Sequence, residues 1–81
     1  MPTIFRWNGF RFFFFSNENT PPEPCHIHVS RAEKIAKFWI LETVDIDSSK
    51  NMTSKELKQL KKIIDDKKSL IEEAYNEHIC K

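Results

Sequence analysis

The chain has 81 residues, a length typical of one domain with a thin hydrophobic core. Its 13 basic residues against 12 acidic ones give a net charge of +1, which argues against a general polyanion binder, because such domains usually carry a marked basic excess. No apolar run approaches the roughly 18 residues that a membrane span needs, and the first residues lack the pattern of a secretion signal. We therefore expect one cytoplasmic domain, residues 1–81, with no membrane contact. The two cysteines, Cys25 and Cys80, do not indicate a disulfide framework.

The first half of the chain, residues 1–41, is predicted to form a four-stranded antiparallel sheet. The dipeptide Asn8-Gly9 favours a type I′ hairpin turn, with a positive φ at the glycine. The four phenylalanines from Phe12 to Phe15 put two aromatic rings on each face of the second strand, so both faces need a cover. The predicted strands are Thr3–Trp7, Phe10–Ser16, 25–31 and 35–41.

The second half is predicted to be helical, after a polar connection over residues 42–52. Thr53 and Glu56 have the spacing of a capping box, which marks the start of a helix. Apolar residues then recur at helical spacing, but this stripe lapses at Lys67 and Lys68. The segment 53–80 is therefore either one helix or two helices with a break near residues 66–69. The predicted fold is α+β, with the sheet packed on this helix or helix pair.

The third predicted strand contains two histidines, His26 and His28, separated by one residue. Successive side chains of a strand point to opposite faces, so both imidazoles share one face at a Cα spacing of about 6.5–7 Å. Two imidazoles so placed can bind one divalent transition metal such as zinc, which needs three or four ligands in all. The simpler interpretation is two polar residues facing outward on a half-buried strand. The spacing does not select a further ligand from His78, Glu18, Glu23 and Cys80.

The same two histidines can act as a general acid and base, because imidazole titrates near pH 6.5. With a nearby cation they could attack and stabilise a phosphodiester, as a metal-independent ribonuclease does. The candidate catalytic set is His26, His28 and Arg11, with Arg31 or Lys37 as other sources of positive charge. The simpler interpretation is that these cations are ordinary solvated residues.

Two further surfaces are candidates for binding. Lys55, Lys58 and Lys62 fall on one stripe of the predicted helix and could contact nucleic acid, although the favoured interpretation is an ordinary solvated helix face. Seven phenylalanines and two tryptophans are many for one thin core. Aromatic residues are enriched at interfaces, so part of this surface could meet a second copy or a partner chain.

An ordered set of motifs along nearly the whole chain resembles the bacterial domain-of-unknown-function family 4160. The resemblance implies a small bacterial protein that is often encoded beside a member of unknown-function family 2442, in pairs proposed as toxin–antitoxin modules. Tyr75 stands where that family usually has tryptophan, and Asn51 where it often has glycine. The matching segments are 1–4, 9–11, 14–17, 23–29, 36–39, 55–57 and 75–78.

The resemblance carries no settled chemistry, so whether the protein is an enzyme stays open. The expected function is a binding component of a toxin–antitoxin-like two-gene module, acting through protein contact and possible contact with nucleic acid. The alternative is a small histidine-dependent nuclease or hydrolase, or a metal-binding module built on His26 and His28.

Overall fold

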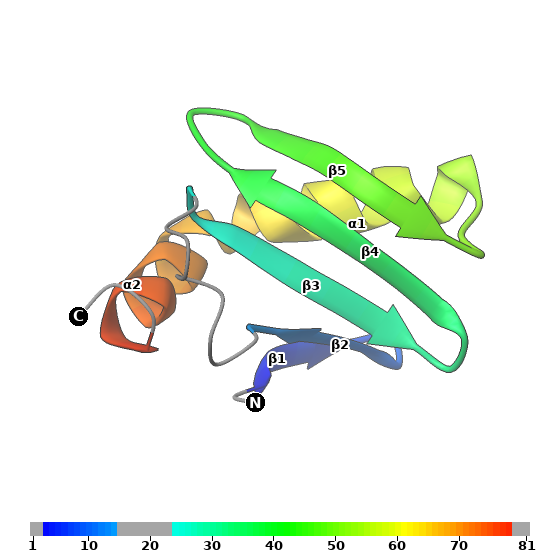
Figure 1. Cartoon of the computed structure of the whole chain (residues 1–81), viewed down its shortest axis with the longest axis horizontal. Coiled ribbons are helices and arrows are strands. Elements are labelled where there is room, and N and C mark those ends of the chain that lie inside the picture. The colour runs from blue at the N-terminus through cyan, green and yellow to red at the C-terminus, as the bar shows by residue number, and fades with distance from the viewer. Residues whose placement is uncertain (1–2, 15–23, 79–81) are drawn as a thin grey trace.

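The computed structural model describes residues 3–14 and 24–78, with side chains through residue 76. It is an α+β structure, in which five antiparallel strands form one sheet in the order β1-β2-β3-β4-β5 and two helices follow (Figure 1). The predicted class is confirmed, but the sheet has five strands rather than four. The elements are β1 (Thr3–Trp7), β2 (Phe10–Phe13), β3 (His26–Arg31), β4 (Lys34–Ile40), β5 (Val44–Lys50), α1 (Ser54–Asp66) and α2 (Lys68–His78).

The β1–β2 hairpin turns at Asn8 and Gly9, as predicted. Their φ angles are 50° and 81°, and both central residues of a type I′ turn need a positive φ. A Cβ at Gly9 would lie 3.1 Å from Nε of the exposed Arg31 side chain, which would have to move slightly to accept it. The predicted end of this hairpin at Ser16 lies outside the described residues.

The prediction of a polar connection over residues 42–52 is wrong, because Val44–Lys50 is the edge strand β5, paired antiparallel with β4. Only Val44 is buried in β5. An edge strand that buries so little is rich in polar residues and resembles a loop in composition. The short alternation of apolar and polar residues was therefore not recognised as a strand. Asn51, just after β5, has a φ of 63° and donates its side-chain amide to the Glu33 carbonyl at 3.0 Å. Asparagine tolerates this left-handed conformation, which is otherwise typical of glycine.

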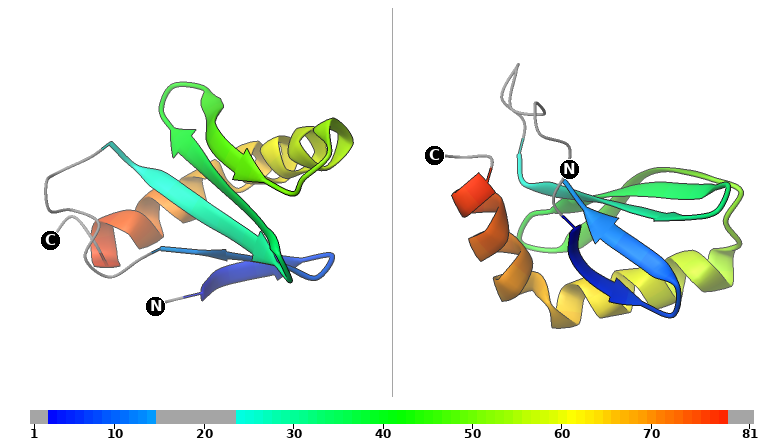
Figure 2. Two further views of the ribbon diagram at one scale, coloured as in Figure 1. Left: turned by 45° about the vertical axis from the view of Figure 1, so that its right-hand side comes forward. Right: turned by 90° about the horizontal axis from the view of Figure 1, so that it is seen from below.

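The hydrophobic core lies between α1 and one face of the sheet (Figure 2). Leu60 and Ile64 of α1 are completely buried, and their spacing of four residues is the one that the apolar stripe predicts. Phe12, Phe13 and Phe14 are each 3% exposed or less. The described part of the phenylalanine run is therefore buried within this chain rather than left for a partner.

The helical segment is two helices, and the break lies at Lys67, inside the range that the sequence allowed. The N–H of Lys67 bonds the carbonyls of Ile63 and Ile64, which closes the last turn of α1. The chain then changes direction, so that α2 runs toward the end of the sheet where β2 ends and β3 begins (Figures 1 and 2). This turn brings Ile71 and Tyr75 of α2 into the core.

The predicted capping box is present at the start of α1. The Glu56 N–H donates to the Thr53 hydroxyl at 3.1 Å, and the Thr53 N–H donates to the Glu56 carboxylate at 3.0 Å. The same carboxylate forms an ion pair with Lys34, which joins α1 to β4. The hydrogen bond from Lys34, followed by the one from the Thr53 backbone, lowers the pKa of Glu56 below its ordinary value.

This lowered pKa predicts an acid-sensitive contribution to stability. The folded state holds the Glu56 proton more weakly than the unfolded state, so the contribution is present above the ordinary pKa of 4.5 and is lost as pH falls through the lower folded pKa. Urea melts of Glu56→Gln and the parent chain should therefore differ at pH 7 and converge below pH 4.5. Glu72→Gln, an exposed change on α2, is the control. A constant difference at every pH would contradict the assignment.

Candidate functional site

The two faces of the sheet differ sharply around β3. Ile27 and Val29 are completely buried on the face that α1 covers. The alternation of the strand turns His26, His28 and Ser30 toward the other face, as the sequence predicts. Because β3 pairs with β2 on one side and β4 on the other, this second face is built from neighbouring rows of side chains.

His26 lies in a closed aromatic environment. It is 0% exposed, and its ring centroid lies 5.5 Å from that of Trp39 on β4 and 5.9 Å from that of Tyr75 on α2. Its Nδ1 lies 2.8 Å from the Pro24 carbonyl, which can only accept, so Nδ1 is the donor. The backbone thus fixes the ring orientation and places the lone pair of a neutral ring on Nε2.

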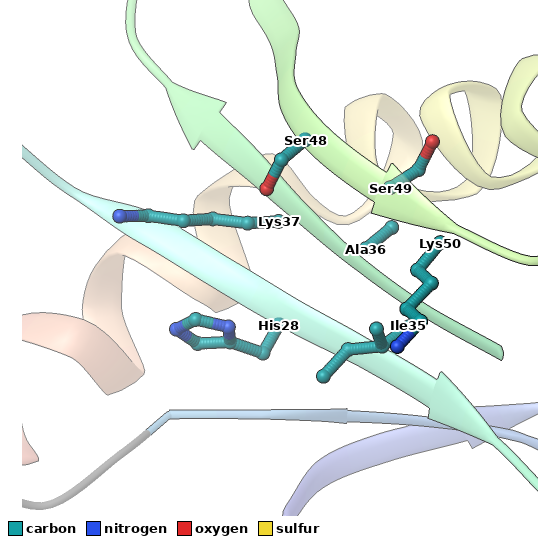
Figure 3. A pocket seen from close by; sticks show the side chains of 7 residues that line it. All are labelled: His28, Ile35, Ala36, Lys37, Ser48, Ser49 and Lys50. Carbon is teal, nitrogen blue, oxygen red and sulfur yellow. The ribbon is translucent and has the colours of Figure 1, made fainter. Parts of the chain in front are cut away.

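His28 lies at the border between this closed environment and solvent. It is 9% exposed, and its ring centroid is 5.4 Å from that of His26 and 5.7 Å from that of Phe13. Beside it, β3, β4 and β5 form a hollow of about 370 Å³ (Figure 3). Lys37, the register partner of His28, faces this hollow. The lining residues are His28, Ile35, Ala36, Lys37, Ser48, Ser49 and Lys50.

Cations on this face rest on aromatic rings. The Arg11 guanidinium lies 4.3 Å from the centroid of Phe13, and its Nε donates to the Thr3 hydroxyl at 2.8 Å. Lys37 Nζ lies 4.5 Å from the Trp39 ring. Such contacts hold each cation in place and cover part of the aromatic face. Arg11 therefore shares the face of His28, in the next cross-strand row.

Arg31 lies on the opposite face, where its guanidinium is 5.5 Å from the Phe10 ring. Strand parity separates residue 31 from residues 26 and 28, so the sequence alone contained the signal to exclude it. Of the three cations considered with the histidines, the structure brings Lys37 closest in register, places Arg11 on the same face, and directs Arg31 away.

The described residues bring together two metal-binding side chains rather than a full ligand set. Within residues 3–14 and 24–78, no three His, Cys, Asp or Glu side chains gather in a group that could hold a metal ion. The further ligands considered from sequence, Glu18, Glu23, Cys80 and the His78 side chain, lie outside the described part. The backbone-bonded ring of His26 does have the orientation that metal-bound histidines often show.

The helical lysines considered for nucleic acid lie away from the histidines, on α1. Lys55, Lys58 and Lys62 are exposed and form no ion pair with the residues that the structure describes. Two adjoining hollows, of about 280 and 380 Å³, follow the border between α1 and β5 and share Lys58 and Lys61. Together these hollows form a groove, which we call the β5–α1 groove. Its lining residues are Phe38, Glu42, Thr43, Val44, Ile46, Ser54, Leu57, Lys58, Lys61, Lys62 and Asp65.

Comparison with known families supports the resemblance seen in the motifs. The sequence model of a family described as "Domain of unknown function (DUF4160)" matches residues 9–76, which is most of the chain. The chain belongs to the DUF4160 family. No curated protein and no solved structure matches it. The DUF4160 match spans the histidine strand, the hollow and the groove together.

Sequence reasoning missed four residues around the histidines of this DUF4160 protein. Ser48 and Lys50 were assigned to a connection, although the apolar alternation at Val44 and Ile46 would have placed them on a strand. Trp39 was assigned only to the fourth strand and Tyr75 to the helix stripe; the contact of Trp39 with His26 follows from the β3–β4 pairing, and that of Tyr75 from how α2 meets the sheet.

No helix among the described residues is long and apolar enough to cross a membrane.

Proposed function

We propose that this DUF4160 protein is the binding component of a toxin–antitoxin-like two-gene module and acts through protein contact at the β5–α1 groove. The observation that carries this proposal is an exposed apolar side chain on a sheet edge, beside lysines that have no partner among the described residues. Ile46 is 44% exposed and lines the groove with Leu57 and the buried ring of Phe38. The partner is the product of the adjacent gene, which the family resemblance suggests is a member of unknown-function family 2442.

The groove favours an extended segment as its occupant. Within the described sheet β5 is an edge strand, so its outer N–H and C=O groups can pair with an added strand. The groove runs beside α1 from Ser54 to Asp65, about 16 Å at 1.5 Å per residue. That length accommodates about five extended residues. Alternate side chains of such a segment would reach the apolar floor at Ile46 and Leu57.

The charges of the groove favour an acidic segment. The part near Ser54 is lined by Lys58 and Lys61 and by no acidic residue. Glu42 and Asp65 line only the far part, where Lys62 adds a third cation. An acidic segment entering beside Ser54 would therefore meet complementary charge first. This occupant also accounts for two of the three helical lysines considered for nucleic acid.

The proposal predicts that Ile46→Glu weakens binding of the cognate protein roughly tenfold or more, because it puts a charge on the apolar floor. The two genes should be co-expressed, and the complex followed by size-exclusion chromatography and calorimetry. Lys58→Glu with Lys61→Glu should also weaken binding. The matched control is Leu70→Glu, since Leu70 on α2 is 47% exposed.

Separate elution of the two parent proteins would overturn the proposal, as would equal weakening by Ile46→Glu and Leu70→Glu. Retention of RNA in place of the cognate protein, lost in the double lysine variant, would assign the groove to nucleic acid instead.

A small histidine-dependent nuclease is the second candidate, supported by the position of His28 beside Lys37 at a hollow open to solvent. A base and a neighbouring cation are the groups that phosphodiester cleavage needs. The complete burial of His26 gives that residue the role of orienting His28 rather than touching a substrate. Cleavage of RNA by the parent protein, abolished in His28→Ala, would support this candidate; unchanged cleavage would remove it.

A further inference from the structure

The hollow beside His28 is lined by cationic and neutral groups only. Lys50 supplies an ammonium group and Ser48 a hydroxyl, the stem of Lys37 lines one side, and no aspartate or glutamate lines the hollow. Lys50 forms no ion pair with any residue that the structure describes. From this arrangement we infer a binding site for a small phosphate monoester, on the sheet face opposite the core. The site goes beyond the proposed partner contact, which uses a different surface.

The polar groups of the hollow suit a phosphate. The Lys50 ammonium group is a mobile donor on a four-carbon stem, so it can turn toward an anion in the hollow. The Lys37 ammonium group lies 4.5 Å from the Trp39 ring and adds positive charge at one side. The Ser48 hydroxyl adds a neutral donor of the kind that phosphate oxygens accept. Three strands contribute the lining, with His28 from β3, Lys37 from β4 and both Ser48 and Lys50 from β5 (Figure 3). The cross-strand register of the sheet, rather than one flexible loop, therefore holds them together.

The floor of the hollow suits the apolar part of such an ester. Ile35 is 39% exposed there, and Ala36 lies beside it between the strands. An apolar side chain left uncovered among lysines offers a flat contact for a ring or short hydrocarbon. The volume of about 370 Å³ is within the usual range for a site that holds one small molecule. A mononucleotide has both parts, a dianionic phosphate and a flat ring.

The neighbouring aromatic rings argue against a long single strand of nucleic acid on this face. Such strands bind by stacking successive bases on open aromatic rings. Here Arg11 covers Phe13, and Lys37 covers Trp39, whose indole N–H also donates to Asp47 at 3.0 Å. The rings therefore anchor cations instead of offering free faces. The hollow is the place on this face where apolar surface and positive charge meet.

The test is a titration of the full chain with adenosine 5′-monophosphate, inorganic phosphate and adenosine, followed by amide chemical shifts and calorimetry. We expect the monophosphate to bind and to shift amides of β3, β4 and β5. Inorganic phosphate should bind more weakly, and adenosine should not bind measurably. Lys50→Gln should weaken binding of the monophosphate roughly tenfold to a hundredfold, the loss expected for one charged hydrogen bond.

The matched control is Lys55→Gln, an exposed lysine on α1 outside the hollow, which should leave the affinity unchanged. Both changes are on the surface, so melting temperatures should stay close to that of the parent. Absence of binding, or equal weakening by the two variants, would overturn the proposal. Equal affinity for inorganic phosphate would replace it with a free-phosphate site, and tighter binding of a longer oligonucleotide would overturn it in favour of a strand-binding face. None of these outcomes depends on whether the β5–α1 groove binds a partner protein.

Discussion

Replacing Phe38 with alanine is expected to destabilise the domain by about 3–5 kcal/mol, the loss typical of a fully buried phenylalanine. Phe38 is 1% exposed and lies on β4, the strand between β3 and β5. Its ring belongs to the cluster under α1 with Leu60 and Ile64. Removing it takes apolar area out of the core and leaves a cavity that the paired strands cannot close. Urea denaturation measured by circular dichroism gives the free energy of unfolding.

A domain of 81 residues has a total stability of about 4–12 kcal/mol, so this change alone could unfold much of the population. Ile35→Ala, on the same strand but on the other face and 39% exposed, is the control and should cost less than about 1 kcal/mol. Similar losses for the two variants would mean that the core does not lie on the face where α1 packs.

Replacing His26 with alanine is expected to cost about 2–4 kcal/mol, because a completely buried ring and its hydrogen bond to Pro24 are both lost. The cavity would open between Trp39 and Tyr75, so the attachment of α2 to the sheet should loosen first. Hydrogen exchange of the α2 amides is the local readout, and thermal melting gives the total effect.

His28→Ala is the comparison, and it should cost less, because His28 lies at the edge of the solvent-open hollow. The two variants also separate the structural and metal-binding interpretations of the histidine pair. A parent protein that loses stability in a chelator, with neither variant responding to the chelator, would show that the pair holds a metal. Equal stability of His26→Ala and the parent would contradict the structural role assigned to the buried ring.

The two proposed sites, the β5–α1 groove and the hollow beside His28, lie on different parts of the sheet. The β5–α1 groove lies at the edge strand beside α1, whereas the hollow lies across β3, β4 and β5 on the face opposite the core. The register shift between Lys37 and Phe38 in the β4–β5 pairing leaves Ile46 opposite Phe38 and Lys50 opposite Ile35, so that Ile46 lines the groove and Lys50 lines the hollow.

Local patterns in the sequence were sufficient wherever neighbouring residues decide the structure. The Asn8-Gly9 turn follows from the need for two positive φ angles, and the capping box from groups three residues apart. The placement of His26 and His28 on one face follows from the pleat of a strand. The family was recognisable because its motifs occur in order along most of the chain.

Long-range contacts decided the rest. β5 escaped prediction because an edge strand buries little, and only its pairing with β4 identifies it. The burial of His26 could not be predicted from sequence, because it depends on a contact with Tyr75 of α2, which lies 49 positions later in the chain. A helix break lies between the two residues, and no local pattern sets the direction in which the chain continues after it. The sequence by itself determined the α+β class, the turn, the helix start and the face of the histidines. The packing of α2 and the pairing of β5, which depend on contacts between distant segments, decided which histidine meets solvent and where a ligand can bind.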